Sequence, residues 1–446
     1  MNDYAFSLRQ GGMSAESAEG KAKVFDELVH AADHLAFNKQ RRLFHVPGRI
    51  EVLGKHTDYA GGRSLLCCVE KGFCILASAR NDRGIRFVDI SRNSTARWEL
   101  TSAPIVPPTS WAIYPVTVTR RIAQNFPSAQ SGVDVVFSSD LPRAAGMSSS
   151  SAFVVAAFFC VAAANNLDQS EEFQANIQTK EDLATYLGCV ENGSSFRLLA
   201  GDVGVGTFGG SEDHTAIICC QAGQISQFTF CPTQFERTIA VPTELTFVIA
   251  SSGVASEKTG DQQQQYNRLS VATDSILGMW NKVYGRSVIS LGCAVASSSE
   301  ATPQIRDLIR AQADSSVPAA FLSNRFEQFI AETYEIVPAA ADALRQSNWS
   351  EFGRVVDLSQ SYAEELLENQ VSETSFLARS ARELGAVAAS AFGAGFGGSV
   401  WALVESGKSA EFIDAWASSY RHRFPERESA RFFASKCGPA AQEIAV

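Results

Sequence analysis

The sequence has no long apolar run, no surplus of positive charge and no clustered pattern of cysteine and histidine. Its longest apolar run, residues 152–164, is shorter than the roughly 20 residues that a membrane-spanning helix needs, so we expect a buried helix there. The formal net charge of −10 excludes a general affinity for nucleic acids or anionic membranes, because such binding needs a concentrated basic surface. An anionic ligand must therefore be held by a local site.

The ten cysteines show none of the CxxC or Cys/His spacings of a zinc site. Adjacent pairs such as Cys67-Cys68 and Cys219-Cys220 lie in apolar runs, which is typical of small core residues in a reduced protein. The N-terminal segment has no apolar core behind basic residues, so a secretory signal is not predicted. We expect a cytoplasmic protein.

The chain has 446 residues, of which 45% are hydrophobic and 19% charged, enough for two domains with separate cores. A change of composition near Pro232 and Pro242 predicts a division into residues 1–235 and 236–446. Short β-rich runs predict a sheet in the first half, with a hairpin-like pair of strands over 215–231. The second half is expected to be mostly helical between 261 and 384.

The stretch LPRAAGMSSSSAF lies where a predicted strand turns into the apolar helix. Backbone N–H groups at a helix start and several hydroxyls would meet there, which is typical of a phosphate cradle with a hydroxyl available to Mg²⁺. The competing interpretation is a serine-rich helix cap. The stretch is not a Walker loop, and no GxGxxG motif opens a dinucleotide-binding unit.

Three further stretches carry candidate chemistry. The opening segment GRIEVLGKHTDYAGG, residues 48–62, is dense in donors and acceptors and suits a polyhydroxylated ligand, although a surface ion-pair loop would have the same composition. Asp213 in GGSEDHTAI could accept a hydroxyl proton or could cap a helix. The late glycine loop FGAGFGGS could be a tight turn or could contact a ligand, and a ligand contact is favoured only if the loop pairs with the serine loop. His45 and His214 are expected to be structural.

At these residues the sequence resembles the GHMP kinase superfamily and, within it, the galactokinases. Their opening signature, GRxNxxGEHxDYxxG, and their phosphate loop, PxGxGLSSSA, are matched in order, followed by the closing glycine motif. The matching residues are Gly48, Arg49, Gly54, His56, Asp58, Tyr59 and Gly62, then Pro142, Gly146, Ser148, Ser149 and Ser150, and finally Gly393, Gly395, Gly397 and Gly398.

The resemblance implies an α+β kinase with two lobes, an N-terminal lobe like ribosomal S5 domain 2 and a ferredoxin-like C-terminal lobe. ATP and sugar would bind between the lobes, and the anomeric hydroxyl of galactose or a close relative would be phosphorylated. The roles that the resemblance implies are catalysis for Asp213 and Arg49, sugar contacts for Lys55, His56, Asp58 and Tyr266, phosphate binding for Gly146, Ser148, Ser149 and Ser150, and Mg²⁺ binding for Ser150 and Glu191. The partners are small molecules, and we expect a monomer or a weak homodimer.

The sequence departs from the family pattern at two positions of the opening signature and in the spacing after Glu191. Glu51 stands where galactokinases usually carry Asn, and Lys55 stands where they carry Glu. A lysine in the pocket would favour an anionic group, which makes galacturonate or another uronic acid a candidate substrate; a lysine turned back to Glu51 would leave the substrate unchanged. The 22 positions between Glu191 and Asp213 exceed the usual connection and weaken the Glu191 assignment. A non-catalytic sugar and ATP sensor is the third hypothesis.

Overall fold

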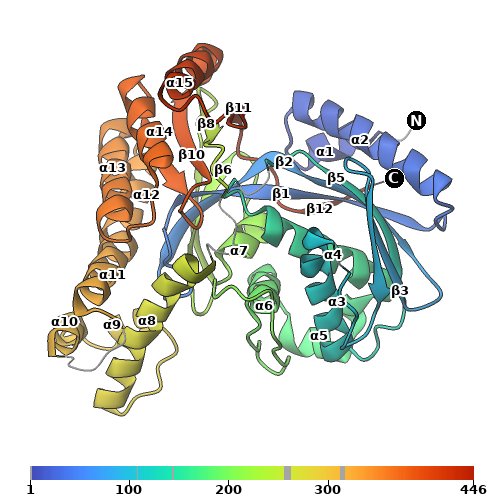
Figure 1. Ribbon diagram of the computed structural model, residues 1–446, viewed down its shortest axis with the longest axis horizontal. Helices are drawn as coiled ribbons and strands as arrows, with labels where there is room; N and C mark the ends of the chain where they lie inside the picture. The colour runs from blue at the N-terminus through green and yellow to red at the C-terminus, as the bar shows by residue number, and fades with distance from the viewer. Residues whose placement is uncertain (1–2, 108, 143–144, 256–262, 312–316, 446) are drawn as a thin grey trace.

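The computed structural model describes residues 3–107, 109–142, 145–255, 263–311 and 317–445. Two β-sheets, each covered by helices, make up this part of the chain (Figure 1). The two ends of the chain lie close together, since the backbone N–H of Ala445 donates to the hydroxyl of Ser7. Within the described residues, no helix combines the length and the apolar composition needed to cross a lipid bilayer.

The larger sheet has eight strands in the order β12-β1-β2-β5-β3-β4, with the β6–β7 hairpin added to the side of β2. All pairings are antiparallel except that of β3 with β5. The long strand β2 pairs with both β5 and β6 at different points along its length. The strands are β1 (Arg41–Leu53), β2 (Arg63–Ala79), β3 (Gly84–Asp89), β4 (Ser94–Glu99), β5 (Val133–Ser139), β6 (Gln224–Thr229), β7 (Gln234–Ala240) and β12 (Gln442–Ile444).

Helices cover both faces of this sheet because its strands alternate apolar side chains between them. Leu43 packs in the cluster under α1 and α2, while its neighbour Phe44 packs on the opposite side with α4. The helices of this half are α1 (Tyr4–Gln10), α2 (Ala15–His34), α3 (Ile113–Asn125), α4 (Ser149–Asn165), α5 (Glu171–Asn176), α6 (Lys180–Asn192) and α7 (Glu212–Cys219), with short 3₁₀ turns at Ser110–Ala112 and Leu167–Gln169.

The apolar run that follows the serines forms the buried helix α4, as predicted. Phe153 stacks on Phe73 of β2 with ring centroids 5.1 Å apart and lies 4.9 Å from the ring of Phe137 of β5. Aromatic pairs at such distances add to the burial of apolar area. This packing fixes the start of α4, and with it the serine-rich loop, against the sheet.

The smaller sheet has the order β11-β8-β10-β9 and is antiparallel throughout. Its strands are β8 (Leu245–Ser251), β9 (Ala388–Phe392), β10 (Ser399–Glu405) and β11 (Arg431–Ser435). The helices of this half are α8 (Gln263–Tyr284), α9 (Leu291–Val295), α10 (Ala301–Ala311), α11 (Ala319–Ala331), α12 (Val337–Arg345), α13 (Trp349–Glu365), α14 (Ser372–Glu383) and α15 (Ser409–Arg423), with a π-helical turn at Glu332–Ile336 and a 3₁₀ turn at Ser406–Lys408.

The α+β class is confirmed, whereas the pair of strands expected over 215–231 is wrong. The segment begins within helix α7, which ends at Cys219, and its second part contains strand β6, which pairs with β7 beyond the segment. A short apolar run such as Ala216–Cys220 fits a buried strand or a buried helix equally well by pattern alone. The division at 235/236 stays a prediction; β7 continues to Ala240, and β12 returns from the C-terminal half to pair with β1.

We expect the C-terminal strand to stabilise the N-terminal half. Ile444 is 1% exposed and lies opposite Leu43 of β1, in the cluster beneath α1 and α2. Ile444→Ala should lower the free energy of unfolding by about 2–5 kcal/mol, measured by denaturant titration. The adjacent Glu443, which forms an exposed ion pair with Arg42, provides the control: Glu443→Ala should cost about 1 kcal/mol or less. Equal losses in both variants would contradict this interpretation.

Candidate active site

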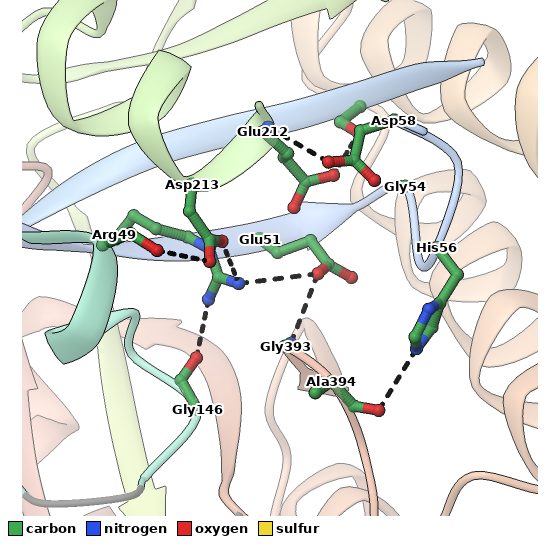
Figure 2. A network of polar contacts seen from close by, with 12 residues as sticks. Arg49, Glu51, Gly54, His56, Asp58, Gly146, Glu212, Asp213, Gly393 and Ala394 are labelled. Atoms are coloured by element: carbon green, nitrogen blue, oxygen red, sulfur yellow. Dashed lines mark hydrogen bonds and ion pairs between the residues drawn. The ribbon is translucent and has the colours of Figure 1, made fainter. Parts of the chain in front are cut away.

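A buried ion pair between Arg49 and Asp213 lies at the centre of the candidate site (Figure 2). Arg49 is near the end of β1 and Asp213 is in the first turn of α7, where the helix dipole favours a carboxylate. The Nε and Nη2 atoms of Arg49 lie 2.8 and 2.6 Å from Oδ1 of Asp213, and Nη1 donates to the carbonyl of Gly146 at 2.6 Å. One guanidinium therefore joins the sheet, the serine loop and α7.

Burial opposes the charge of Arg49, but the nearby carboxylates of Asp213 and Glu51 more than offset it and raise the pKa of Arg49 above its ordinary value. The guanidinium stays charged. A fixed positive charge at this position can stabilise negative charge that develops on a bound group.

Ser151 connects Asp213 to a second buried carboxylate, Glu191. Its Oγ atom lies 2.7 Å from Oε2 of Glu191 and 3.2 Å from Oδ2 of Asp213. The sequence interpretation did not select Ser151, which follows the three serines of the family motif. A run of four serines at a helix start gives no indication of which hydroxyl turns toward the carboxylates, because that depends on where the helix begins.

Glu191 and Asp213 come close despite the 22 positions between them, because the intervening segment folds back on itself. The N–H of Asp202 donates to the carbonyl of Gly193 at 2.9 Å, and the N–H of Val205 donates to the carbonyl of Glu191 at 2.8 Å. The end of α6 thus lies beside the start of α7. The spacing that weakened the Glu191 assignment is absorbed by this loop, and the Mg²⁺ role of Glu191 stays a prediction.

His214 also contacts this group. Its Nε2 atom lies 3.1 Å from Oε2 of Glu191, and the ring is buried. His45, by contrast, is buried in the sheet, and burial lowers its pKa to about 3, so it is neutral and structural as expected.

The serine loop and the closing glycine loop pack directly on one another. A Cβ atom on Gly393 would lie 2.8 Å from the carbonyl oxygen of Gly146, and the hydroxyl of Ser399 donates to the carbonyl of Ala145 at 2.6 Å. Gly146 has a φ of +70°, a conformation that glycine adopts readily. The predicted pairing of the two loops is therefore present. Ala144, which stands where the family's phosphate loop has a glycine, lies outside the described residues.

The predicted phosphate-binding hydroxyls surround the start of α4. Ser148 caps the helix in a left-handed conformation, with a φ of +55°, and is buried, while Ser149 and Ser150 are half-buried in the first turn. The N–H groups of this turn have no partner within the helix. The geometry suits an anion, and the binding roles of these residues stay predictions.

Three of the predicted sugar contacts line one pocket beside the ion pair: His56, Asp58 and Tyr266. The Nε2 atom of His56 lies 3.1 Å from the carbonyl of Ala394, and Nδ1 lies 3.0 Å from the hydroxyl of Tyr59. Because a carbonyl only accepts, Nε2 carries the hydrogen. The His56 ring is 5.5 Å from that of Tyr266, and Oδ2 of Asp58 accepts from the N–H of Glu212.

The fourth predicted sugar contact, Lys55, does not line this pocket. Its side chain is buried and points to the C-terminal half, where Nζ donates to Oγ of Ser359 at 3.0 Å and to Oγ of Ser390 at 2.8 Å. The lysine is therefore turned neither into the pocket nor back toward Glu51. Sequence spacing places Lys55 in a loop but does not decide which lobe receives the side chain.

The charge of Lys55 is balanced through a hydroxyl. Ser359 donates to Oε1 of Glu332 at 3.0 Å, and the same oxygen accepts from the N–H of Gly54 at 2.8 Å. Glu332 begins the π-helical turn and is fully buried. Buried charges need such partners, and this network ties the opening segment to helix α13 and strand β9.

Two buried glutamates in the pocket were not assigned a role from the sequence. Burial raises the pKa of Glu51 to about 7, against the attraction of Arg49 and Lys55. Burial and the carboxyl of Glu51 raise the pKa of Glu212 well above its usual range, although Ser64 donates to it at 2.6 Å. The departure from the family pattern at position 51 could have indicated Glu51 as a pocket residue. No feature of the sequence indicated Glu212.

Three family models match the chain. They are the galactokinase galactose-binding signature over residues 34–79, the GHMP kinases N-terminal domain over 114–193 and the GHMP kinases C-terminal model over 340–422. Among curated proteins, the galactokinase of Chloroflexus aggregans is 24% identical over 399 residues, or 89% of this chain and 92% of the relative. The galactokinase of Bacillus subtilis is 35% identical over 111 residues, 24% and 28% of the two chains.

Solved structures show the same fold. Lactococcus lactis galactokinase, in complex with galactose, is 21% identical with a TM-score of 0.74, covering 94% of this chain and 99% of its own. The mevalonate kinase of Methanococcus jannaschii is 13% identical with a TM-score of 0.53, covering 90% and 99%. The two-lobed GHMP kinase fold is therefore confirmed.

Both halves of the chain thus carry GHMP kinase domains, arranged as in other GHMP kinases, and this defines the class. Within that class, the signature at residues 34–79 and the likeness to curated galactokinases over nearly the whole chain are decisive. The chain is similar to the galactokinases over nearly its whole length and carries their galactose-binding signature. It is accordingly a phosphotransferase with ATP as the phosphoryl donor.

We expect Arg49→Lys to inactivate the enzyme while leaving the fold intact. Lysine keeps the charge but lacks the planar fork, so it cannot contact Asp213 and the Gly146 carbonyl together. The kcat for sugar-dependent ADP release should fall about 100-fold or more. Arg42→Lys, on the same strand in the exposed pair with Glu443, is the control and should retain activity. A kcat within tenfold of the wild type would show that the fork is dispensable.

The raised pKa of Glu51 predicts a pH-dependent stability. The folded protein binds this proton more tightly than the unfolded chain, in which the pKa is 4.5. The stabilisation is complete below pH 4.5 and is lost as the pH rises through about 7. Glu51→Gln removes this loss, so its Tm relative to wild type should rise by about 3 °C between pH 5 and pH 8. The exposed Glu19→Gln serves as control; parallel Tm curves for Glu51→Gln and wild type would refute the assignment.

Proposed function

We propose that the protein transfers the γ-phosphoryl group of ATP to the anomeric hydroxyl of galactose or a close relative. The observation that carries this proposal is the Arg49–Asp213 pair, which lies between the serine loop and a pocket lined by His56 and Asp58. The galactose-binding signature covers the segment that supplies Arg49, His56 and Asp58. The serine loop, a buried carboxylate and the segment matched by the galactose-binding signature thus meet at one point, which supports the proposal.

In this mechanism, Asp213 accepts the proton of the anomeric hydroxyl as its oxygen attacks the γ-phosphorus. The bond from that phosphorus to the bridging oxygen of ADP breaks, and ADP leaves with the electron pair. Arg49 holds Asp213 in place and faces the charge on the transferred group. Phosphoryl transfer depends mainly on alignment and charge stabilisation, which these two side chains supply.

We further propose that the serine loop holds the phosphates through Gly146, Ser148 and Ser149, and that Ser150 and Glu191 hold Mg²⁺. The donor set fits, because Mg²⁺ takes oxygen ligands and usually needs only one or two from protein side chains beside phosphate oxygens. Bound there, the ion would neutralise phosphate charge. Glu191 lies in the last turn of helix α6, and Ser151 connects its carboxylate to that of Asp213.

The charge of the pocket supports a neutral sugar over a uronic acid. Five carboxyl groups line it, and Arg49, which is already paired with Asp213, is its lining cation among the described residues. Lys55, the reason for considering a carboxylate substrate, is bonded elsewhere. The five carboxyl residues are Glu51, Asp58, Glu191, Glu212 and Asp213. The intact Arg49–Asp213 pair likewise supports an enzyme over a sensor.

A cytoplasmic location and a monomeric or weakly dimeric state are part of the proposal. All ten cysteines lie in the described residues as free thiols, which is typical of a reducing compartment. Size-exclusion chromatography with light scattering measures the oligomeric state directly.

Sugar-dependent ADP release across galactose, glucose, mannose and galacturonate is the decisive experiment. We expect the highest kcat/KM with galactose and formation of a sugar 1-phosphate, identified by phosphorus NMR. Asp213→Asn should lower kcat about 100-fold or more, whereas the half-buried Asp342→Asn, in an ion pair with Arg237 outside the pocket lining, should not. A preference for galacturonate would restore the uronic acid hypothesis, and binding without turnover of any sugar would indicate a sensor.

A further inference from the structure

Glu51 has an unused hydrogen-bonding atom at the pocket. Its side chain is 5% exposed; Oε2 accepts from the N–H of Gly393 at 3.3 Å and lies 3.9 Å from Nη2 of Arg49. Its Oε1 atom is buried and has no hydrogen-bond partner among the described residues. Figure 2 shows the carboxylate in the middle of the network, with its second oxygen directed toward the side on which His56 lies. A buried carboxylate oxygen without a donor is costly, so a donor from a ligand would be favoured there.

Compared with the galactokinase signature, this chain carries its acidic side chain at position 51 and not at position 55. The galactokinase signature has Asn at position 51 and a carboxylate at position 55, whereas this chain has the carboxylate at 51 and a lysine at 55 that is bonded to Ser359 and Ser390. The acidic group has moved four positions along the same segment. Because Arg49 and Glu51 are two apart on strand β1, they share one face, and that face lines the pocket.

We propose that Glu51, backed by Glu212, is a specificity-determining residue that accepts a hydrogen bond from a ring hydroxyl of the sugar. The proposal rests on the proposed sugar kinase activity. Glu51 lies between the reacting pair at one side and His56 at the other, so the hydroxyl that it contacts is a ring hydroxyl other than the one that reacts.

The surroundings of the pair are consistent with this role. Arg49 and the more distant charge of Lys55 favour ionisation of Glu51, and Asp213 opposes it. Arg49 favours ionisation of Glu212, and Glu51, Asp58 and Asp213 oppose it. Burial raises the pKa of Glu212 well above its usual range, so Glu212 stays protonated over a wider pH range than an exposed glutamate. One carboxyl of the pair can then stay an acceptor for the substrate while Ser64 keeps Glu212 oriented.

The test compares galactose with its 2-deoxy, 3-deoxy and 4-deoxy analogues in wild type, Glu51→Gln and Glu51→Asn. We expect both variants to raise the KM for galactose about 10-fold or more, with the KM for ATP unchanged, because a charge-assisted hydrogen bond is lost. One deoxy analogue should lose about 10-fold or more in kcat/KM against galactose in wild type but not in Glu51→Gln. Glu70→Gln, a buried glutamate of the neighbouring strand outside this pocket, is the matched control.

The outcomes separate this proposal from the kinase assignment. Identical deoxy-sugar ratios in wild type and Glu51→Gln, with normal Tm values, would overturn the role of Glu51 while leaving the kinase function intact. If another hexose is the better substrate, the same comparison is made with its deoxy analogues. If no sugar releases ADP, the kinase proposal fails, and the role of Glu51 is tested by titration calorimetry of galactose and its deoxy analogues. The same ratios of affinity in wild type and in Glu51→Gln, or no binding of galactose, would refute the role of Glu51.

Discussion

The contact between Arg49 and Asp213 is the constraint on which the rest of the site depends. One guanidinium pairs with a carboxylate of α7 and, through the Gly146 carbonyl, holds the serine loop. Breaking a buried pair by removing one partner costs about 3–5 kcal/mol. The contacts of Arg49 therefore hold helix α7 and the serine loop in fixed positions on β1. The start of α7, the start of α4 and the end of β1 converge for this reason, although they are distant in the sequence.

Charge placement distinguishes this chain from the usual galactokinase pattern. The Nζ atom of Lys55 donates to the hydroxyl of Ser359 in the C-terminal half, and that hydroxyl donates to the carboxylate of Glu332. The pocket itself is left acidic, with Glu51 and Glu212 close together in its wall. The two departures lie four positions apart in one segment but act in different places: Lys55 contacts the C-terminal half, and Glu51 lines the pocket.

Glycine and loop geometry bring the two halves together at the site. The serine loop follows β5 of the larger sheet and the closing glycine loop joins β9 to β10 of the smaller one, and they meet where a side chain on Gly393 would contact the Gly146 carbonyl. His56 adds a contact to Ala394 of the same glycine loop. ATP and sugar would thus be bound by groups from both halves, which explains why the motifs lie so far apart along the chain.

The sequence by itself was enough to find the likeness to galactokinases, the buried helix after the serines and the pairing of the two glycine-containing loops. It also predicted Arg49, Asp213, His56 and Asp58, which the structure brings to one pocket. Local patterns suffice for these features because helix periodicity, turn formation and motif order depend on residues that are close together in the sequence. Tertiary structure alone decided that Ser151 is the serine that bridges the carboxylates, that Glu191 reaches Asp213 across a long loop, and that Lys55 faces away from the pocket. Each of these depends on a partner more than 30 positions away or on the path of an inserted loop, and a side chain in a loop takes its direction from such partners. Helix α7, expected as a strand, was misassigned for a related reason, since a short apolar run is compatible with either structure until its packing is known.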